Sequence, residues 1–349
     1  GRSAPIWTVP DVNAEGERGL LGLAAHPEFD DNGLLYLYYT VDGSTLHNRL
    51  GRITLDGDLV VGDLEVLVDF PSIGSAIRHM GGALRFAREG GDSRSLLFLA
   101  IGDRAQRHLA QDLSNPFGKI HRFLDDGSVP PDNPLIDPGT STASSIWAYG
   151  LRNPFTFAIQ PETGRLFAND VGSKDWEEVN EIVAGGNYGW PSSEGPEVAA
   201  GEIAPLYAYP HSAGACAVTG GVFYPRQGGL YPPEHLGRYF FSDFCAGWIR
   251  QLDPESGDVV PFASGLAAPT NLALDREGRL IYLSRDTTDA DAGIRGRVIR
   301  IGVADAPPPP ELPRILESPR SVTVAAGATV TFSARVENAN STIWLRNDV

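Results

Sequence analysis

The chain has 349 residues, 42% of them hydrophobic, which is enough to bury a large core. It carries 28 basic and 44 acidic residues, a formal net charge of −16, and this excess of acid argues against a nucleic acid or an anionic membrane as partner. The 40 glycines and 27 prolines indicate many tight turns, and no apolar run approaches the ~20 residues of a membrane-spanning helix. These features predict a soluble, all-β protein.

Strand pairs recur along the chain with one layout: an apolar run, a turn rich in Asp, Asn and Gly, and a second apolar run. Residues 20–39 show this layout first, and it returns at 83–102, 155–169 and 271–283. Residues 218–243 contain a further pair with a longer connection. Short strand pairs at intervals of several tens of residues are typical of the blades of a β-propeller. A β-sandwich is the alternative architecture.

A change of composition near residue 304 predicts a domain boundary. Four consecutive prolines follow Ala306, and such a run cannot join a strand interior, so residues 304–313 are predicted to be a stiff linker after a propeller of residues 1–303. Residues 314–349 contain short β-type runs and look like the first half of an immunoglobulin-like domain. A whole domain of that kind needs ~100 residues. We therefore predict a partial immunoglobulin-like segment.

Residue types suited to oxidising an alcohol gather in a few turn-rich segments. His79 lies in a glycine-rich turn, and a neutral imidazole is a good base near neutral pH. Arg152 and Asn153 precede Pro154, which keeps the chain extended, and a guanidinium there can stabilise developing negative charge. Residues 185–191 form a second glycine-rich segment able to offer carbonyl oxygens. Together these segments predict a site that removes the proton of a substrate hydroxyl while a hydride leaves the carbon bearing it for an electrophilic acceptor.

Several motifs, in order along the chain, are similar to those of the soluble glucose/sorbosone dehydrogenase family. They are residues 17–27, 102–103, 111–113 and 132–134 together with the segments around His79, Arg152 and Trp190. The family comprises sugar dehydrogenases that depend on pyrroloquinoline quinone (PQQ), and the propellers of hedgehog-interacting-protein-like molecules. The resemblance, which spans roughly residues 17–301, implies a six-bladed β-propeller. Its first blade is expected to be incomplete, because few residues precede the motif.

The resemblance also implies roles for individual side chains. His79 becomes the general base, Asp103 the carboxylate that orients it, Arg152 a neighbour of the substrate and Asn153 a contact of PQQ. The alternative for the first pair is a turn histidine and an aspartate that caps a hairpin. For Arg152, the alternative is a salt bridge of purely structural importance.

Calcium is the second cofactor that the resemblance implies. The carbonyl oxygens of Gly172 and Ser173 match the loop that holds the PQQ-linked ion, and calcium accepts such oxygen ligands. Glu178 and Tyr188 match a carboxylate and a carbonyl at a second, structural ion. The alternative is an acidic loop that is simply solvated.

Two segments depart from the pattern of the dehydrogenases. Residues 268–274 replace a segment in which the family has two arginines for the carboxylates of PQQ, and the family's lysine position falls near Cys245. Buried carboxylates without cationic partners are costly. Four other arginines are candidates to substitute: Arg85, Arg104, Arg107 and Arg250.

The two cysteines, Cys216 and Cys245, allow one disulfide in an oxidising compartment or two buried thiols. The hedgehog-interacting-protein-like branch also has cysteines in these segments. The expected location is secreted or periplasmic.

Two functions follow as hypotheses. The first is a soluble PQQ- and calcium-dependent sugar (aldose) dehydrogenase with a sugar substrate and an unknown electron acceptor. The second is a calcium-stabilised extracellular propeller that binds carbohydrate or protein without catalysis. The His79 and Asp103 motifs favour the enzyme, and the replaced arginine segment favours the binding protein.

Overall fold

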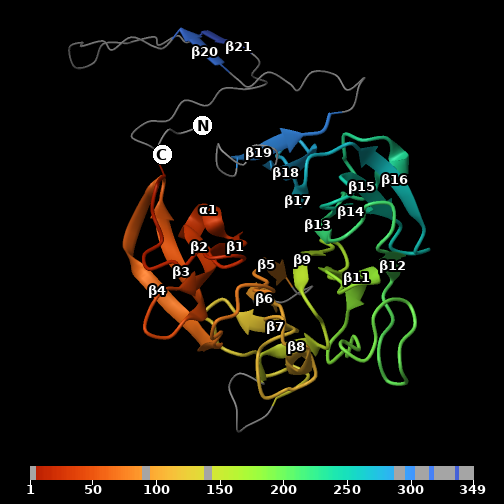
Figure 1. Ribbon diagram of the computed structural model, residues 1–349. Coiled ribbons are helices and arrows are strands. Elements are labelled where there is room, and N and C mark those ends of the chain that lie inside the picture. The colour runs from red at the N-terminus through yellow and green to blue at the C-terminus, as the bar shows by residue number, and fades with distance from the viewer. Residues whose placement is uncertain are drawn as a thin grey trace, which may run out of the picture. The chain divides into compact units, whose positions relative to one another are not determined.

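The computed structural model describes residues 5–88, 95–136, 144–286, 295–302, 314–317 and 335–337. The chain divides into two compact units, Gly1–Ile301 and Gly302–Val349. The described residues of the first unit form five antiparallel sheets that follow one another around a common centre (Figure 1). This arrangement is a β-propeller.

Each sheet is a meander of consecutive strands. The first contains β1 (Leu20–Ala25), β2 (Leu34–Val41), β3 (His47–Asp56) and β4 (Leu59–Ser72). The second contains β5 (Leu84–Arg88), β6 (Ser95–Ile101), β7 (Lys119–Leu124) and β8 (Ile146–Tyr149). The third contains β9 (Pro154–Ile159), β10 (Leu166–Asp170), β11 (Trp176–Ile182) and β12 (Tyr207–Pro210). The fourth contains β13 (Val218–Phe223), β14 (Tyr239–Asp243), β15 (Trp248–Leu252) and β16 (Val259–Ser264), and the fifth β17 (Pro269–Leu274), β18 (Leu280–Asp286) and β19 (Arg295–Arg300).

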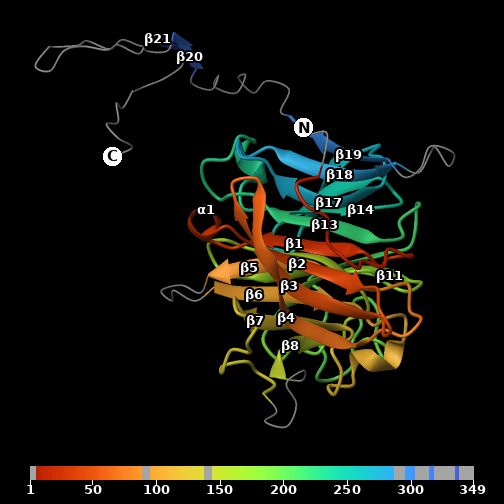
Figure 2. The ribbon, with the colours of Figure 1, turned by 90° about the vertical axis from the view of Figure 1, so that its left-hand side faces the viewer.

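The first strand of each sheet lies nearest the centre of the propeller. Consecutive inner strands are in contact, β1 with β5, β5 with β9, β9 with β13 and β13 with β17 (Figure 1). Figure 2 views the same unit from the side of the first sheet. In the described connections lie three short helices: α1 (Phe29–Asn32), η1 (Arg107–Ala110) and η2 (Pro233–His235). Among the described helices, none has both the length and the apolar character needed to cross a membrane.

The prediction of six blades is wrong for the described part of the chain, which forms five. The five strand pairs visible in the sequence each became the inner hairpin of one sheet. The sixth blade was expected only from the family resemblance. Residues 5–19 contribute no strand there, and Val12 makes only an isolated bridge to Val41 of β2.

The hydrophobic core lies between neighbouring sheets, and β6 illustrates how the sequence builds it. Every residue of β6 is buried, because one face of the strand packs towards the first sheet and the other towards the third. Leu97 and Leu99 belong to a cluster with Tyr36 and Tyr38 of β2. The alternate residues Leu96, Phe98 and Ala100 belong to a cluster with Phe157 of β9. A strand that is buried on both faces therefore reads as a continuous apolar run.

The inner strands of the first two sheets approach so closely that they require glycine. A Cβ atom on Gly22 would lie 2.1 Å from the carbonyl oxygen of Gly82, and one on Gly82 would lie 2.5 Å from the Cβ of Leu21. Gly82 also has a φ of 115°, which side chains rarely allow. Larger residues at either position would push β1 away from β5.

His121 on β7 is a buried group whose protonation opposes folding at acidic pH. Its Nε2 lies 2.8 Å from the carbonyl oxygen of Pro116 and its Nδ1 2.9 Å from the hydroxyl of Ser145, so the neutral ring satisfies both partners. Burial lowers the pKa of His121 to about 4. The unfolded chain therefore binds this proton first, and stability is lost as the pH falls from about 6.5 to about 4.

We expect His121→Gln, which keeps a donor and an acceptor, to remove part of this acid sensitivity. The difference in the free energy of unfolding between pH 6.5 and pH 4 should shrink by about 3 kcal/mol, as measured by urea denaturation at each pH. An equal dependence of the free energy of unfolding on pH in the wild type and the variant would show that His121 is not the source of the acid sensitivity.

In the second unit, the described residues form only β20 (Arg314–Glu317) and β21 (Arg335–Glu337), which pair antiparallel. The predicted linker of residues 304–313 lies outside the described residues. So does most of the predicted immunoglobulin-like segment of residues 314–349, which stays a prediction.

Candidate functional site

His79 and Asp103 lie at one end of the second sheet, next to its inner hairpin. His79 precedes β5 and Asp103 follows β6, and the pairing of these strands brings the two ends together, with a hydrogen bond of 2.8 Å from the Gly82 amide to the Ala100 carbonyl. The Nδ1 atom of His79 lies 2.7 Å from Oδ1 of Asp103. Both side chains are buried, with 11% and 1% of their surface exposed. The structure thus joins the predicted base to its predicted partner.

The carboxylate of Asp103 determines which ring nitrogen of His79 carries the proton. Its Oδ1 also accepts the Ala105 amide at 2.7 Å, and its Oδ2 accepts the Trp190 indole N–H at 2.9 Å. An acceptor of these donors is an ionised carboxylate, so Nδ1 of His79 donates to it and Nε2 keeps a free lone pair. Among the described residues, Nε2 has no hydrogen-bond partner. It is the atom able to take a proton.

Glu17 holds the backbone of His79 in an unusual conformation. The φ of His79 is 56°, in the left-handed region that residues other than glycine seldom adopt. The Glu17 carboxylate accepts the His79 amide at 2.6 Å, from the segment that precedes β1. Sequence reasoning placed Glu17 in a family motif but gave it no role. This contact stabilises the backbone conformation from which the imidazole side chain extends.

Arg152 and Asn153 lie between β8 and β9, directly beside this pair. Their amides donate to the carboxylate of Asp170, at 2.9 and 2.6 Å, and the Arg152 carbonyl accepts the Asp103 amide at 2.8 Å. The Arg152 guanidinium donates to the carbonyl of Val171 at 2.7 Å. Backbone hydrogen bonds therefore connect the segment of Arg152 to the loop of Asp103.

Trp190 is the centre of the site, a role that the sequence did not reveal. Its ring has the guanidinium groups of Arg107 and Arg152 over it, at 5.7 and 5.6 Å from the ring centroid. Its indole N–H reaches Asp103 across 87 positions of sequence. We call the end of the propeller that carries His79, Asp103, Arg152 and Trp190 the mouth. The mouth combines a base with an aromatic ring flanked by two cations.

Asn153 offers the mouth an unused hydrogen-bonding atom. Its Oδ1 is buried and, among the described residues, has no partner. Gly102 makes room for it, because a Cβ there would lie 2.8 Å from this Oδ1 and 2.4 Å from the His79 carbonyl. A buried amide oxygen left unpaired costs about 1–3 kcal/mol. It therefore marks a position where a bound molecule can donate a hydrogen bond.

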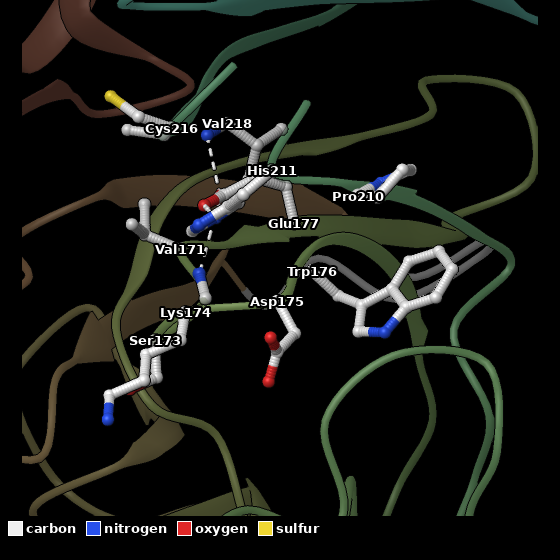
Figure 3. Close-up of polar contacts among 12 residues, drawn as sticks. Val171, Ser173, Lys174, Asp175, Trp176, Glu177, Pro210, His211, Cys216 and Val218 are labelled. Carbon is white, nitrogen blue, oxygen red and sulfur yellow. Dashed lines mark hydrogen bonds and ion pairs between the residues drawn. The ribbon is translucent and has the colours of Figure 1, made fainter. Parts of the chain in front are cut away.

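The predicted calcium loop is held from both sides by glutamates. Glu177 is fully buried and pairs with His211, and its carboxylate accepts the Val218 amide at 2.8 Å (Figure 3). It also accepts the Gly172 amide at 3.3 Å. Burial raises the pKa of Glu177. Glu194 accepts four consecutive amides, those of residues 173–176, at 2.8–3.3 Å. Burial raises the pKa of Glu194, but these amide bonds outweigh it and hold the pKa below its usual range. Glu194 was not among the predicted site residues.

The four amides also determine where the loop carbonyls point. In a trans peptide the N–H and C=O groups point in opposite directions. Because the amides of residues 173 and 174 point at Glu194, the carbonyls of Gly172 and Ser173 point away from it. Among the described residues, neither carbonyl accepts a hydrogen bond. Both are free to bind a cation.

The two residues predicted for a structural calcium are engaged with protein groups. The Glu178 carboxylate accepts the Gly195 amide at 2.6 Å and the Asn180 side chain at 3.1 Å, and burial raises its pKa to about 7. The Tyr188 hydroxyl donates to the Glu181 carbonyl at 2.6 Å, so only its backbone carbonyl remains for the predicted role.

The four arginines that could substitute for the family's cationic residues differ in position. Arg107 flanks Trp190 in the mouth. Arg104 lies over the Phe117 ring, 4.1 Å from its centroid, and donates to the Ser72 carbonyl. Arg250 lies over Trp248 of the fourth sheet, and Arg85 lines a cavity near the centre of the propeller. Only Arg107 joins Arg152 beside Trp190.

One aspartate recurs at the same place in three successive sheets, where the second strand ends. Asp103 binds His79, which precedes the first strand of its sheet. Asp170 accepts amides from the segment that precedes β9, and burial, with repulsion from Glu178, raises its pKa well above the usual range. Asp243 accepts the amides of Cys216 and its neighbour, just before β13. We call this arrangement the aspartate clamp.

Cys216 and Cys245 form a disulfide, with 5.6 Å between their Cα atoms. Of the two alternatives left open by the sequence, the structure therefore has the bonded pair. Asp243 lies beside it, fully buried, and accepts the Cys245 amide at 2.9 Å. Because both sulfurs are bonded to each other, this cluster is not a metal site.

The described part of the chain is thus a β-propeller whose mouth holds a buried His79–Asp103 pair. The sequence profile described as glucose/sorbosone dehydrogenase matches residues 1–258. The chain therefore belongs to the glucose/sorbosone dehydrogenase family.

Individual relatives agree with this assignment. The chain is 36% identical over 195 residues to aldose sugar dehydrogenase YliI of Escherichia coli, covering 55% of this chain and 51% of the relative. It is 26% identical over 352 residues to the HIPL2 protein of Arabidopsis thaliana, covering 76% and 49%. The PQQ-bound aldose sugar dehydrogenase of Streptomyces coelicolor superposes with a TM-score of 0.67 at 26% identity, covering 84% and 82% of the two chains. The chain spans about half the length of the curated relatives it matches.

Proposed function

We propose that the protein is a PQQ-dependent sugar dehydrogenase that oxidises a hydroxyl group of an aldose. The observation that carries this proposal is the free Nε2 of His79, which Asp103 holds beside a tryptophan flanked by two guanidinium groups. Family membership and the PQQ-bound relative support the choice of cofactor. The electron acceptor is a second molecule outside the chain.

The side chains of the mouth have separate tasks in this reaction. Nε2 of His79 takes the proton of the sugar hydroxyl while a hydride leaves the carbon that bears this hydroxyl. Asp103 stabilises the imidazolium that forms. Arg152 stabilises negative charge that develops on oxygen. PQQ, when bound, supplies the quinone that accepts the hydride and its two electrons.

The residues of the mouth fit an anionic planar cofactor. The guanidinium group of Arg107 suits one of its carboxylates, and the unpaired Oδ1 of Asn153 suits a donor on its ring system. We propose that these contacts replace the arginine pair that β17 lacks.

We propose that calcium binds to the carbonyl oxygens of Gly172 and Ser173. The support is their direction away from Glu194 and their lack of donors among the described residues. We propose that the carboxylate of Glu178 and the backbone carbonyl of Tyr188 bind a second calcium ion. This ion would replace the Gly195 amide and the Asn180 side chain as partners of the Glu178 carboxylate.

We expect Glu194→Ala to weaken calcium binding by about 10–100-fold, because the loop amides lose the acceptor that orients them. The measurement is calorimetric titration of calcium into metal-free protein. Glu202→Ala is the matched control, since Glu202 accepts the Ala199 amide and two serine hydroxyls in the neighbouring loop. An unchanged affinity in Glu194→Ala would count against the loop as a calcium site.

The proposed function is tested by titrating PQQ into calcium-loaded protein and then following dye reduction with a panel of aldoses. Tight binding together with dye reduction is the expected result. Absence of binding at high micromolar PQQ would exclude the cofactor and with it the proposed reaction.

A second function, carbohydrate or protein binding without catalysis, is favoured by one observation. Residues 269–274 form the inner strand β17 and carry no arginine for PQQ. Absence of PQQ binding would support this function, and the ligand would then be sought among glycans and proteins. For either function we propose a secreted or periplasmic location, since the disulfide requires an oxidising compartment.

A further inference from the structure

A cavity of about 470 Å³ is lined mainly by the inner strands of the propeller, and none of the four residues that define the mouth lines it. Four of the five sheets contribute to it through β1, β5, β9, β17 and β18. Gly81, two residues beyond His79, is part of its wall. Its size falls within the ~300–1,000 Å³ typical of small-molecule sites. The cavity is therefore large enough to hold a small ligand.

Arg85 on β5 brings a positive charge to this cavity. Its one hydrogen bond among the described residues goes to the carbonyl of its neighbour Leu84, at 2.8 Å. No carboxylate of the described residues forms an ion pair with it. Burial lowers the pKa of Arg85, but a guanidinium stays protonated in proteins. Within the described residues the charge is thus without a counterion, although the sequence has 16 more acidic than basic residues.

The remaining wall combines apolar surface with a few polar groups. Leu20 and Leu283 line the cavity with 44% and 46% of their surface exposed, and Phe155 adds an aromatic side. Thr156 and Asn271 supply a hydroxyl and an amide. One cation, a few hydrogen-bonding groups and apolar walls suit a molecule with a single carboxylate on an apolar body.

We propose that the central cavity binds a small carboxylate with an apolar body, and that Arg85 pairs with the carboxylate. His79, Asp103, Arg152 and Trp190 do not line this cavity, and the proposal does not depend on the proposed dehydrogenase activity. The polyhydroxylated sugars of the proposed reaction suit these walls poorly, so the expected ligands are medium-chain or aromatic carboxylates.

The probe is octanoate, titrated by calorimetry into the PQQ-free protein, with neutral octanamide as the matched ligand. Octanoate should bind about 10–100-fold more tightly than octanamide, because only the carboxylate makes a charge-assisted bond to Arg85. Arg85→Met should abolish this difference. Arg250→Met should keep it, since Arg250 also lacks a carboxylate partner among the described residues but lies over Trp248.

Leu283→Glu is a second variant in case Arg85→Met fails to fold. It places a carboxylate in the cavity wall at a half-exposed position, and it should weaken the binding of octanoate. An unchanged circular dichroism spectrum would show that the variant is folded. Equal binding of octanoate and octanamide, or unaltered binding by Arg85→Met, would overturn the proposal. Displacement of octanoate by saturating PQQ would also overturn it, since the cavity would then belong to the cofactor's site.

Discussion

His79→Ala is expected to lower the turnover of aldose by about 10²–10⁴-fold while PQQ still binds. The reason is that Nε2 of His79 is the atom of the mouth placed to take the hydroxyl proton, and alanine leaves no base there. The measurement is dye reduction at saturating sugar, together with calorimetric titration of PQQ. Retained turnover would remove His79 from the mechanism.

Two further variants separate the base from its surroundings. Asp103→Asn should also lower turnover by about 10²–10⁴-fold, because an amide in place of the carboxylate favours the wrong tautomer of His79. His47→Ala is the matched control, since His47 likewise lies 3.1 Å from an aspartate, Asp69, but on β3. It should leave turnover unchanged, and a comparable loss would point to a general effect on folding.

Asp243→Ala is expected to cause the largest loss of stability, about 3–5 kcal/mol in the free energy of unfolding. Its carboxylate is fully buried and accepts the amides of Cys216, Cys245 and their neighbours as well as the Tyr209 hydroxyl, 2.9 Å away. Alanine would remove the acceptor of all these donors, and it would leave the hydroxyl of the buried Tyr209 without its partner. The measurement is urea denaturation with the disulfide intact.

Asp126→Ala provides the comparison for this effect. Asp126 accepts the Ser128 amide at 2.8 Å in an exposed turn, where water can replace the carboxylate. We expect a loss of about 1 kcal/mol or less. A similarly small loss in Asp243→Ala would show that the fourth sheet does not depend on its aspartate clamp.

The inner hairpins could be predicted from the sequence, and the number of blades could not. Strands such as β6 are buried on both faces, so they appear as apolar runs next to an Asp- or Gly-rich turn. The outer strand β4 has mostly exposed and half-buried residues and lacks that signal. The sixth blade was inferred from a resemblance, and no strand pair in the sequence corresponded to it.

The site was predictable only where it follows local strand order. His79 and Asp103 flank one hairpin, so a motif at each end was enough to suggest their contact. Trp190 and Glu17 contact the same pair from loops outside the second sheet. Trp190 lies 87 positions from Asp103 in the sequence, and Glu17 lies 62 positions from His79. Such contacts depend on how sheets pack around the centre, which no local pattern encodes. Glu194 went unnoticed for the same reason.

The aspartate clamp suggests how a catalytic pair can arise from a structural repeat. In the third and fourth sheets the clamp joins Asp170 and Asp243 to backbone amides, which any sequence supplies. In the second sheet the same carboxylate position meets a side chain, that of His79. A single histidine next to an existing aspartate clamp would thus have been enough to create a proton-transfer site. The other two sheets are accordingly natural places to engineer a second one by transplanting the segment around His79.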